Sequence, residues 1–258
     1  MIKWWEQVHF FERFLDRLAN SKYKNSLILK GGFLLSSLLG IAERSTIDMD
    51  FSVSKIEFNK ENMREVIHQI IQVDLQDDIS FQISDITEIM EFSTYIGYQV
   101  SLMGKLDNIK VSFHIDLATS DPITPDKITY KYKQIIEKNI IEIKSYTVET
   151  VLAEKLQTIM DKRIGNSRMK DFYDIYILMK LHKNLFNIEI LDTAIKSTFE
   201  YRNSTIDKTE FRDLLMVLEE DNSFVSRWNN FTNKNHYVDD IDFKDVKVEI
   251  LKMIDYIE

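Results

Sequence analysis

The spacing of apolar residues changes character near the middle of the chain. The first part mixes helical spacing with the apolar–polar alternation of half-buried strands. A short apolar segment at 26–30 ends at a strand-to-helix junction, Gly31-Gly32. Elsewhere in this part, the pattern predicts helices at 4–19, 33–40 and 59–74 and strands at 47–53, 79–84, 95–103 and 109–118.

From residue 147 onward the spacing is mostly helical, and Pro122 and Pro125 mark a turn or boundary before it. We therefore predict an α+β fold in two parts. Residues 1–135 form an N-terminal domain with a small mixed sheet flanked by helices, and residues 136–258 form a C-terminal helical bundle domain. The helices expected in the second part are 147–161, 168–182, 187–200, 208–219 and 242–257.

The composition excludes several classes of protein. The chain has 258 residues, of which 44% are apolar and 29% charged, as in globular domains. It has no cysteine, which excludes a disulfide framework, a thiolate zinc site and a cysteine nucleophile. Charged residues interrupt the apolar N-terminus, and no run of 18 apolar residues follows, so we expect a cytoplasmic protein without a membrane anchor. The net charge of −9 argues against a surface covered in basic residues.

Two aspartates two positions apart, Asp48 and Asp50, stand on a predicted strand and therefore point to the same face. On the predicted strand 109–118, Asp116 shares a polar face with Ser112 and His114, so an adjacent strand would bring it beside the pair. Three carboxylates can hold Mg²⁺, or Mn²⁺, for in-line phosphoryl chemistry on an NTP. By itself, such a pair is also common at exposed strand positions or in turns.

The Gly31-Gly32 junction adds weight to the metal hypothesis. Glycines let backbone N–H groups approach a phosphate closely, and the start of the next helix favours an anion. The junction precedes Asp48 by a short segment. The combination favours nucleotide chemistry slightly over a structural turn.

Three ordered segments resemble the AbiEii/AbiGii toxin family, which belongs to the DNA polymerase β-like nucleotidyltransferases. The likeness spans roughly residues 28–180. The matching segments are LKGGFLLSSLLGIAERSTIDMDF at 29–51, VETVLAEKL at 148–156 and RMKDFYDIYIL at 168–178.

The resemblance implies that residues 1–135 are a nucleotidyltransferase domain and that the helical domain completes the active-site cleft. Together with the strand pattern, the resemblance implies that the catalytic residues are Asp48, Asp50, Asp116, Lys155 and Asp171. Of these, Asp48, Asp50 and Asp116 are the expected metal ligands. The resemblance also gives a nucleotide-binding set comprising Lys30, Gly31, Gly32, Ser36, Arg44, Thr46 and Asp174.

Several of these residues also have structural interpretations. The alternative for Lys155 is a surface lysine with a packed stem, and for Asp171 and Asp174 it is charge near a helix start. For Asp171 we favour the functional role. Arg44 and Thr46 either bind phosphate or brace their loop.

One residue departs from the pattern of many nucleotidyltransferases. Phe33 stands where they have Ser or Thr directly after the glycines, which leaves Ser36 or backbone amides for phosphate contact.

The resemblance implies transfer of a nucleoside monophosphate from an NTP to RNA, such as a tRNA, by the toxin of a type IV-like toxin–antitoxin or phage-defence system. A cognate antitoxin would be encoded nearby. The run 155–170, with five positive residues against a single Asp161, has a local charge of +4 that suits RNA or a solvated helix face. One alternative is a small-molecule (for example aminoglycoside) nucleotidyltransferase, which the net acidity suits. The other is a non-catalytic nucleotide- or protein-binding module, which Phe33 keeps open.

Overall fold

The computed structural model describes residues 4–40, 42–44, 46, 48–92, 95–119, 121–238 and 240–258. The chain divides into two compact units. The first unit comprises Met1–Ser120 and Lys127–Tyr146, and the second comprises Asp121–Asp126 and Thr147–Glu258. The boundary predicted at 135/136 therefore falls inside the first unit.

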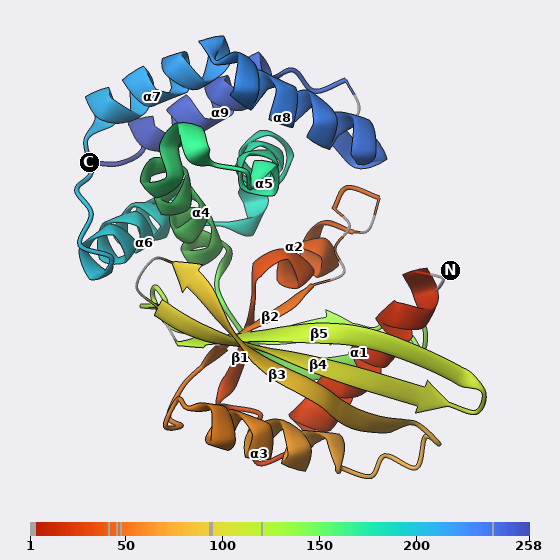
Figure 1. Ribbon diagram of the computed structural model, residues 1–258. Helices are drawn as coiled ribbons and strands as arrows, with labels where there is room; N and C mark the ends of the chain where they lie inside the picture. Colours follow the sequence, from red (N-terminus) through yellow and green to blue (C-terminus); the bar gives the residue numbers. More distant parts are fainter. Residues whose placement is uncertain are drawn as a thin grey trace. The chain divides into compact units, whose positions relative to one another are not determined.

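Within the described residues, the first unit is built on a seven-stranded mixed sheet with the order β3-β4-β5-β2-β1-β7-β6. Figure 1 shows the long strands β3, β4 and β5 side by side. β2 pairs parallel with β5 and β1 pairs parallel with β7, whereas the other neighbours are antiparallel. The strands are β1 (Leu27–Lys30), β2 (Met49–Val53), β3 (Ser80–Phe92), β4 (Tyr95–Leu106), β5 (Ile109–Thr119), β6 (Ile128–Lys133) and β7 (Ile140–Ser145).

One face of the sheet is apolar and is covered by helices α1 (Trp4–Ala19) and α3 (Lys60–Ile71). On β5, Phe113 and its alternate neighbours are buried, while the residues between them are half-buried or exposed. The ring of Phe10 on α1 fills the space beside Gly104, where a Cβ atom would lie 2.3 Å from it. The expected amphipathic pattern is confirmed, and the opposite face of β3, β4 and β5 keeps its polar residues.

The β6–β7 hairpin is a feature that the sequence prediction missed. The prolines favoured a boundary over 120–135, and no element was predicted for 136–146. Tyr130 and Tyr132 alternate with Lys131 and Lys133 on β6, and Tyr132 is buried while both lysines are exposed. This alternation is the period of a strand, so the signal for a strand was present.

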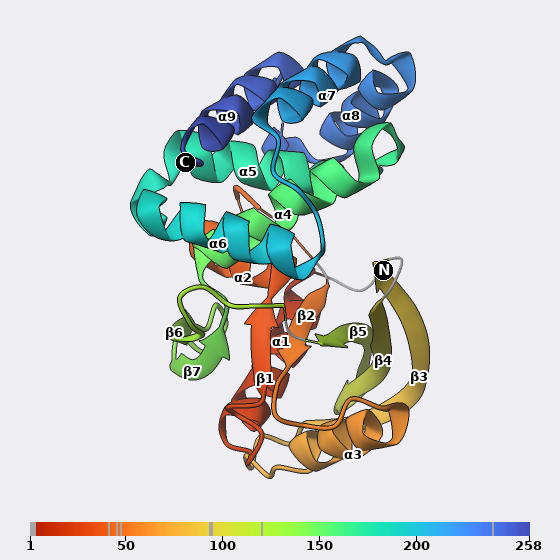
Figure 2. The same ribbon diagram turned by 90° about the vertical axis from the view of Figure 1, so that its left-hand side faces the viewer.

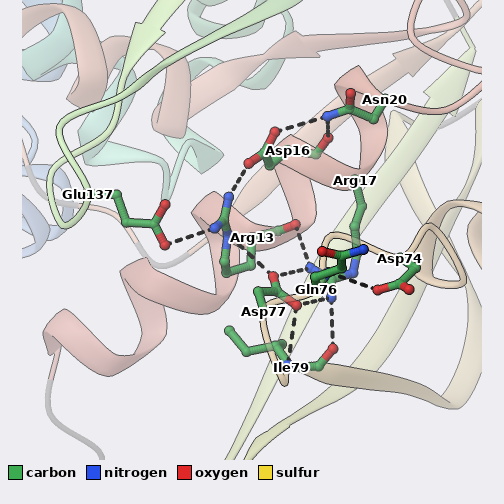
Figure 3. A network of polar contacts seen from close by, with 9 residues as sticks. All are labelled: Arg13, Asp16, Arg17, Asn20, Asp74, Gln76, Asp77, Ile79 and Glu137. Atoms are coloured by element: carbon green, nitrogen blue, oxygen red, sulfur yellow. Dashed lines mark hydrogen bonds and ion pairs between the residues drawn. The ribbon is translucent and has the colours of Figure 1, made fainter.

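Ion pairs join α1 to two loops of the first unit (Figure 3). Arg13 Nη1 donates to Glu137 Oε1 at 2.8 Å, in the loop between β6 and β7. Arg17 donates to both carboxylate oxygens of Asp77 at 2.8 and 2.6 Å, and to the carbonyl oxygen of Ile79 at 2.7 Å. Burial raises the pKa of Asp77, but its hydrogen bonds and the charge of Arg17 outweigh burial, so that the pKa lies below its ordinary value.

The second unit is helical, as predicted. Its centre is aromatic: the Phe172 ring lies 5.2 Å from that of Phe224 and 5.7 Å from that of Phe243, in edge-to-face contacts. The helix α8 was not predicted. No helix in the described part of the chain is long and apolar enough to cross a membrane. The helices are α4 (Val148–Lys162), α5 (Met169–Leu181), α6 (Ile188–Tyr201), α7 (Lys208–Glu220), α8 (Asn222–Lys234) and α9 (Phe243–Asp255), with short 3-10 turns at Arg163–Gly165, Lys183–Leu185 and His236–Val238.

Candidate active site

The turn from β1 into α2 (Gly31–Leu39) has no room for a side chain at its first glycine. Figure 2 shows β1 leading directly into α2, with β2 alongside β1. Gly31 has a positive φ of 66°, which favours glycine. A Cβ atom on Gly31 would lie 2.1 Å from Oδ2 of Asp50. The Asp50 carboxylate therefore occupies the space of the missing side chain, directly beside the first turn of α2.

Four polar residues form a row across neighbouring strands of the sheet. Lys30 on β1 is the register partner of Asp50 on β2, and Asp50 is the register partner of Asp116 on β5. Asp116 is in turn the partner of Gln99 on β4. Register partners on neighbouring strands point to the same face, so the four side chains share one face of the sheet. The expectation that an adjacent strand brings Asp116 beside the Asp48/Asp50 pair is confirmed for Asp50.

The charges of this row favour a further cation. Lys30 is buried, with Nζ 6.0 Å from the centre of the Tyr146 ring, and contributes one positive charge against two half-buried carboxylates. Adjacent carboxylates repel unless a cation compensates them. Mg²⁺ binds through one or two protein carboxylates plus substrate phosphates, so Asp50 and Asp116 fit it. Among the described residues, no group of three or more His, Cys, Asp or Glu gathers as a metal site, so the three-acid set with Asp48 stays a prediction.

Asp48 lies in the loop before β2 and not on the strand. β2 begins at Met49, so the predicted strand position of Asp48 is wrong, and residue 47, the predicted start, lies outside the described residues. The strand starts late because its partner β1 ends at Lys30 and turns into a helix. The Asp48 side chain is exposed, and its backbone N–H donates to Oγ1 of Thr46 at 3.3 Å.

The second glycine packs against the loop that leads to Asp48. A Cβ atom on Gly32 would lie 3.0 Å from Nη2 of Arg44 and 3.2 Å from Oγ1 of Thr46, and both of these side chains are buried. The Ser36 hydroxyl donates to the carbonyl oxygen of Arg44 at 2.6 Å. Ser36 and Thr46 therefore have contacts that brace the loop, which was one of the two roles left open by the sequence for Thr46.

The ring of Phe33 belongs to the core of the first unit. Its side chain is buried, stacks on Tyr132 at 5.7 Å and meets the ring of Phe11 edge-on at 5.5 Å. Phe33 therefore provides packing at the position where many nucleotidyltransferases have a hydroxyl. With the Ser36 hydroxyl bound to Arg44, the backbone amides of the first turn of α2 are the groups suited to a phosphate.

A second cluster of predicted residues lies within the helical unit. Lys155 Nζ on α4 contacts Oδ1 of Asp171 at 2.7 Å and Oδ2 of Asp174 at 2.8 Å, both on α5. All three side chains are buried. Arg168 Nε donates to the other oxygen of Asp171 at 2.8 Å. The lysine thus has its ammonium fixed between two carboxylates, and both aspartates orient it.

Acidic partners compensate much of the positive charge of the basic run 155–170. At least three of its five cations are in ion pairs: Lys155 in the cluster above, Arg168 with Asp171, and Arg163 with Glu210 at 2.5 Å. The local charge of +4 counted along the sequence is therefore largely compensated in three dimensions, which weakens its support for an RNA surface.

Two polar contacts join β4 and β5 on the face that contains Asp116. Gln99 Nε2 donates to Oδ1 of Asp116 at 3.0 Å. The exposed His114 lies 3.0 Å, through Nδ1, from the hydroxyl of Ser101 on the same face. Sequence reasoning missed Gln99. Its signal was its place on the polar face of a predicted strand, but the partner strand and register were needed to pair it with Asp116.

The mixed sheet, the glycine turn and the paired carboxylates are the arrangement that the resemblance to nucleotidyltransferases implies. Residues 13–247 match the family described as "Nucleotidyl transferase AbiEii toxin, Type IV TA system". The match covers most of the chain, so the chain belongs to this family.

Two solved structures have a similar fold. A candidate nucleotidyltransferase from H. pylori has a TM-score of 0.55 and 16% identity, over 97% of this chain and 92% of that chain. JHP933 from Helicobacter pylori has a TM-score of 0.53 and 15% identity, over 96% of this chain and 88% of that chain. At these identities the likeness shows the fold alone. A search of curated proteins found no match.

Proposed function

We propose that this protein is an NTP-dependent nucleotidyltransferase that requires Mg²⁺ and modifies RNA, such as a tRNA. The observation that carries the proposal is the in-register pair Asp50 and Asp116 beside Gly31. This arrangement places negative charge for a metal ion next to backbone amides suited to a phosphate. A purely structural turn has no need of paired carboxylates at this point.

In the proposed reaction, a hydroxyl oxygen of the acceptor attacks the α-phosphorus of the NTP. The bond from this phosphorus to the bridging oxygen of the β-phosphate breaks, pyrophosphate leaves, and the hydroxyl proton passes to a carboxylate or to water. Asp50 and Asp116, with Asp48 from the adjoining loop, would hold the metal ion. When bound, Mg²⁺ neutralises charge on the phosphates, and Mn²⁺ is the alternative ion.

The chain's own groups prepare this reaction. The first-turn amides of α2 bind a phosphate oxygen, and Lys30 compensates part of the negative charge of the row. In the helical unit, Asp171 and Asp174 hold the Lys155 ammonium in one position, and the resemblance to the family gives this lysine a catalytic role. A fixed ammonium loses less conformational freedom on binding than a mobile one.

A cationic small molecule is a second candidate acceptor. The net charge of −9 and the ion pairs of Arg163 and Arg168 leave less basic surface than the sequence suggested. An aminoglycoside-like acceptor needs acidic surroundings, whereas RNA needs phosphate contacts.

The family also suggests a biological role. We propose that the transfer arrests growth, that a cognate antitoxin encoded nearby counters it, and that the pair acts in phage defence. The reaction would take place in the cytoplasm, where NTPs and tRNA are present. Induced expression should stop growth, and Asp50→Asn should abolish this effect at equal protein level.

The test of the reaction uses each labelled NTP with Mg²⁺ and, in separate tubes, total RNA or a panel of aminoglycosides. We expect label on RNA with the wild type and at least about a hundredfold less with Asp50→Asn, since a metal-bound carboxylate is lost. The matched control is Asp85→Asn, an exposed carboxylate on the same face of the sheet, on β3.

The possible results separate the candidates. Label on the aminoglycosides but not on RNA would replace RNA with the small-molecule acceptor. NTP binding without transfer to any acceptor would contradict the enzyme proposal and favour a binding module. An equal loss of transfer in Asp85→Asn would show that the effect of Asp50→Asn is not specific to the paired acids.

A further inference from the structure

Asp116 has a different neighbour on each side of β5. On the β2 side its register partner is Asp50, and on the β4 side its partner is Gln99. The amide Nε2 of Gln99 donates to Oδ1 of Asp116 at 3.0 Å. This hydrogen bond fixes one oxygen of the Asp116 carboxylate and leaves its negative charge in place.

The geometry points to Gln99 as a positioning residue that holds the Asp116 carboxylate beside Asp50 for the metal and the NTP. The inference rests on the proposed nucleotidyl transfer and deepens it. Gln99 acts through Asp116, and no contact of its own with the substrate is required. Without its amide, the half-buried Asp116 side chain loses one restraint against the repulsion from Asp50.

The chemistry of an amide suits this position better than a charged group does. A lysine or arginine in place of Gln99 would cancel the negative charge that attracts a metal ion, and a carboxylate would add a third repelling charge. A neutral donor orients the carboxylate and leaves its charge available. Hydrogen-bond partners of metal-binding carboxylates commonly act in this way, and their loss costs about 10–100-fold in metal affinity or activity.

The neighbouring row of the same strands provides a matched control. Ser101 lies two positions after Gln99 on β4, points to the same face and contacts His114 on β5. This contact has a similar length but does not involve an acid of the proposed centre. A general weakening of the β4–β5 pair would change the effect of both variants. A loss of Asp116 positioning would appear only when Gln99 is replaced.

The experiment compares Gln99→Leu, which keeps the side-chain size but removes the donor, with Ser101→Ala in the full-length chain. Three quantities are measured: kcat and KM for nucleotide transfer, the affinity for Mn²⁺ by electron paramagnetic resonance with a non-hydrolysable NTP analogue, and the thermal unfolding midpoint. For Gln99→Leu, we expect Mn²⁺ affinity and kcat to fall about 10–100-fold with an unchanged unfolding midpoint. For Ser101→Ala, we expect all three to match the wild type.

The inference is overturned if Gln99→Leu binds Mn²⁺ and transfers nucleotide like the wild type, or if Ser101→Ala loses as much. It is also overturned if the wild type itself binds no Mn²⁺ with the analogue. If the wild type binds Mn²⁺ but transfers no nucleotide to any acceptor, the proposed function fails. In that case, weaker Mn²⁺ binding by Gln99→Leu still supports the positioning of Asp116.

Discussion

The carboxylate of Asp50 lies where the side chain of residue 31 would be if that residue were not glycine. A Cβ atom on Gly31 would come within 2.1 Å of Oδ2 of Asp50. The backbone that is suited to a phosphate and the acid that is suited to a metal ion are therefore in direct contact. Any side chain at position 31 must displace the acid.

Gly31→Ala is expected to abolish nucleotide transfer at least as fully as Asp50→Asn. The methyl group pushes the Asp50 carboxylate away, and the positive φ adds strain of about 1–2 kcal/mol. Transfer rate and urea unfolding measure the two effects. Gly40→Ala is the control, because Gly40 also has a positive φ of 90° but nothing lies within 4 Å of the added Cβ. Equal loss of transfer in both variants would contradict the role of the contact.

Lys155→Met is expected to lower the free energy of unfolding by about 3–5 kcal/mol, because it leaves the buried carboxylates of Asp171 and Asp174 without their shared cation. Urea denaturation measures this loss. Lys196→Met, which removes a half-exposed ion pair with Asp192, should cost only about 0–1 kcal/mol.

A triple variant separates stability from function in this cluster. Replacing Lys155 with Met and both Asp171 and Asp174 with Leu should regain most of the lost stability, because no uncompensated charge remains buried. Nucleotide transfer should stay absent. Recovery of transfer together with stability would show that the cluster has a structural role only.

Phe33→Ser introduces the hydroxyl that many nucleotidyltransferases have after their glycines. We expect it to lower the free energy of unfolding by about 3–5 kcal/mol, as for other losses of a buried ring, because its contacts with Tyr132 and Phe11 disappear. NTP affinity, measured by calorimetry, should not increase. Phe33→Leu should cost less stability and keep the same NTP affinity. Tighter NTP binding by Phe33→Ser would show that the hydroxyl does reach the phosphate.

Asp77→Asn should reduce the dependence of stability on pH in acid. The pKa of Asp77 in the folded protein lies below the ordinary value of 3.8, so its ionised form stabilises the fold above that pH. This contribution is lost as the pH falls through the folded-state pKa. The difference in unfolding free energy between the wild type and Asp77→Asn should therefore shrink below about pH 4. A constant difference for Asp77→Asn across this pH range would contradict the prediction.

Local patterns were sufficient for most elements of the fold, but not for contacts between distant segments. The helix over residues 4–19 and the face of β5 that contains Asp116 follow from spacing alone. The pairing of Gln99 with Asp116 depends on strand order and register, which a single sequence does not fix.

The net charge of a segment, counted along the sequence, also leaves out contacts with distant segments. For the run 155–170, such a count treats each cation as exposed, whereas Arg163 forms an ion pair with Glu210 on α7. The hairpin β6–β7 is a different case, because its alternation was visible in the sequence. The nearby prolines outweighed it, so that a strand was interpreted as a boundary.

The parallel pairing of β2 with β5 has a consequence for the stage of synthesis at which the two acids can meet. Strand β2 is synthesised well before β5, and α3, β3 and β4 separate them in the chain. Contacts between such distant segments form slowly compared with local ones. A nascent chain that ends before β5 has Asp50 but not Asp116. The acid pair therefore comes together only once a long stretch of polypeptide has left the ribosome, and a translation product interrupted before that point lacks half of the pair.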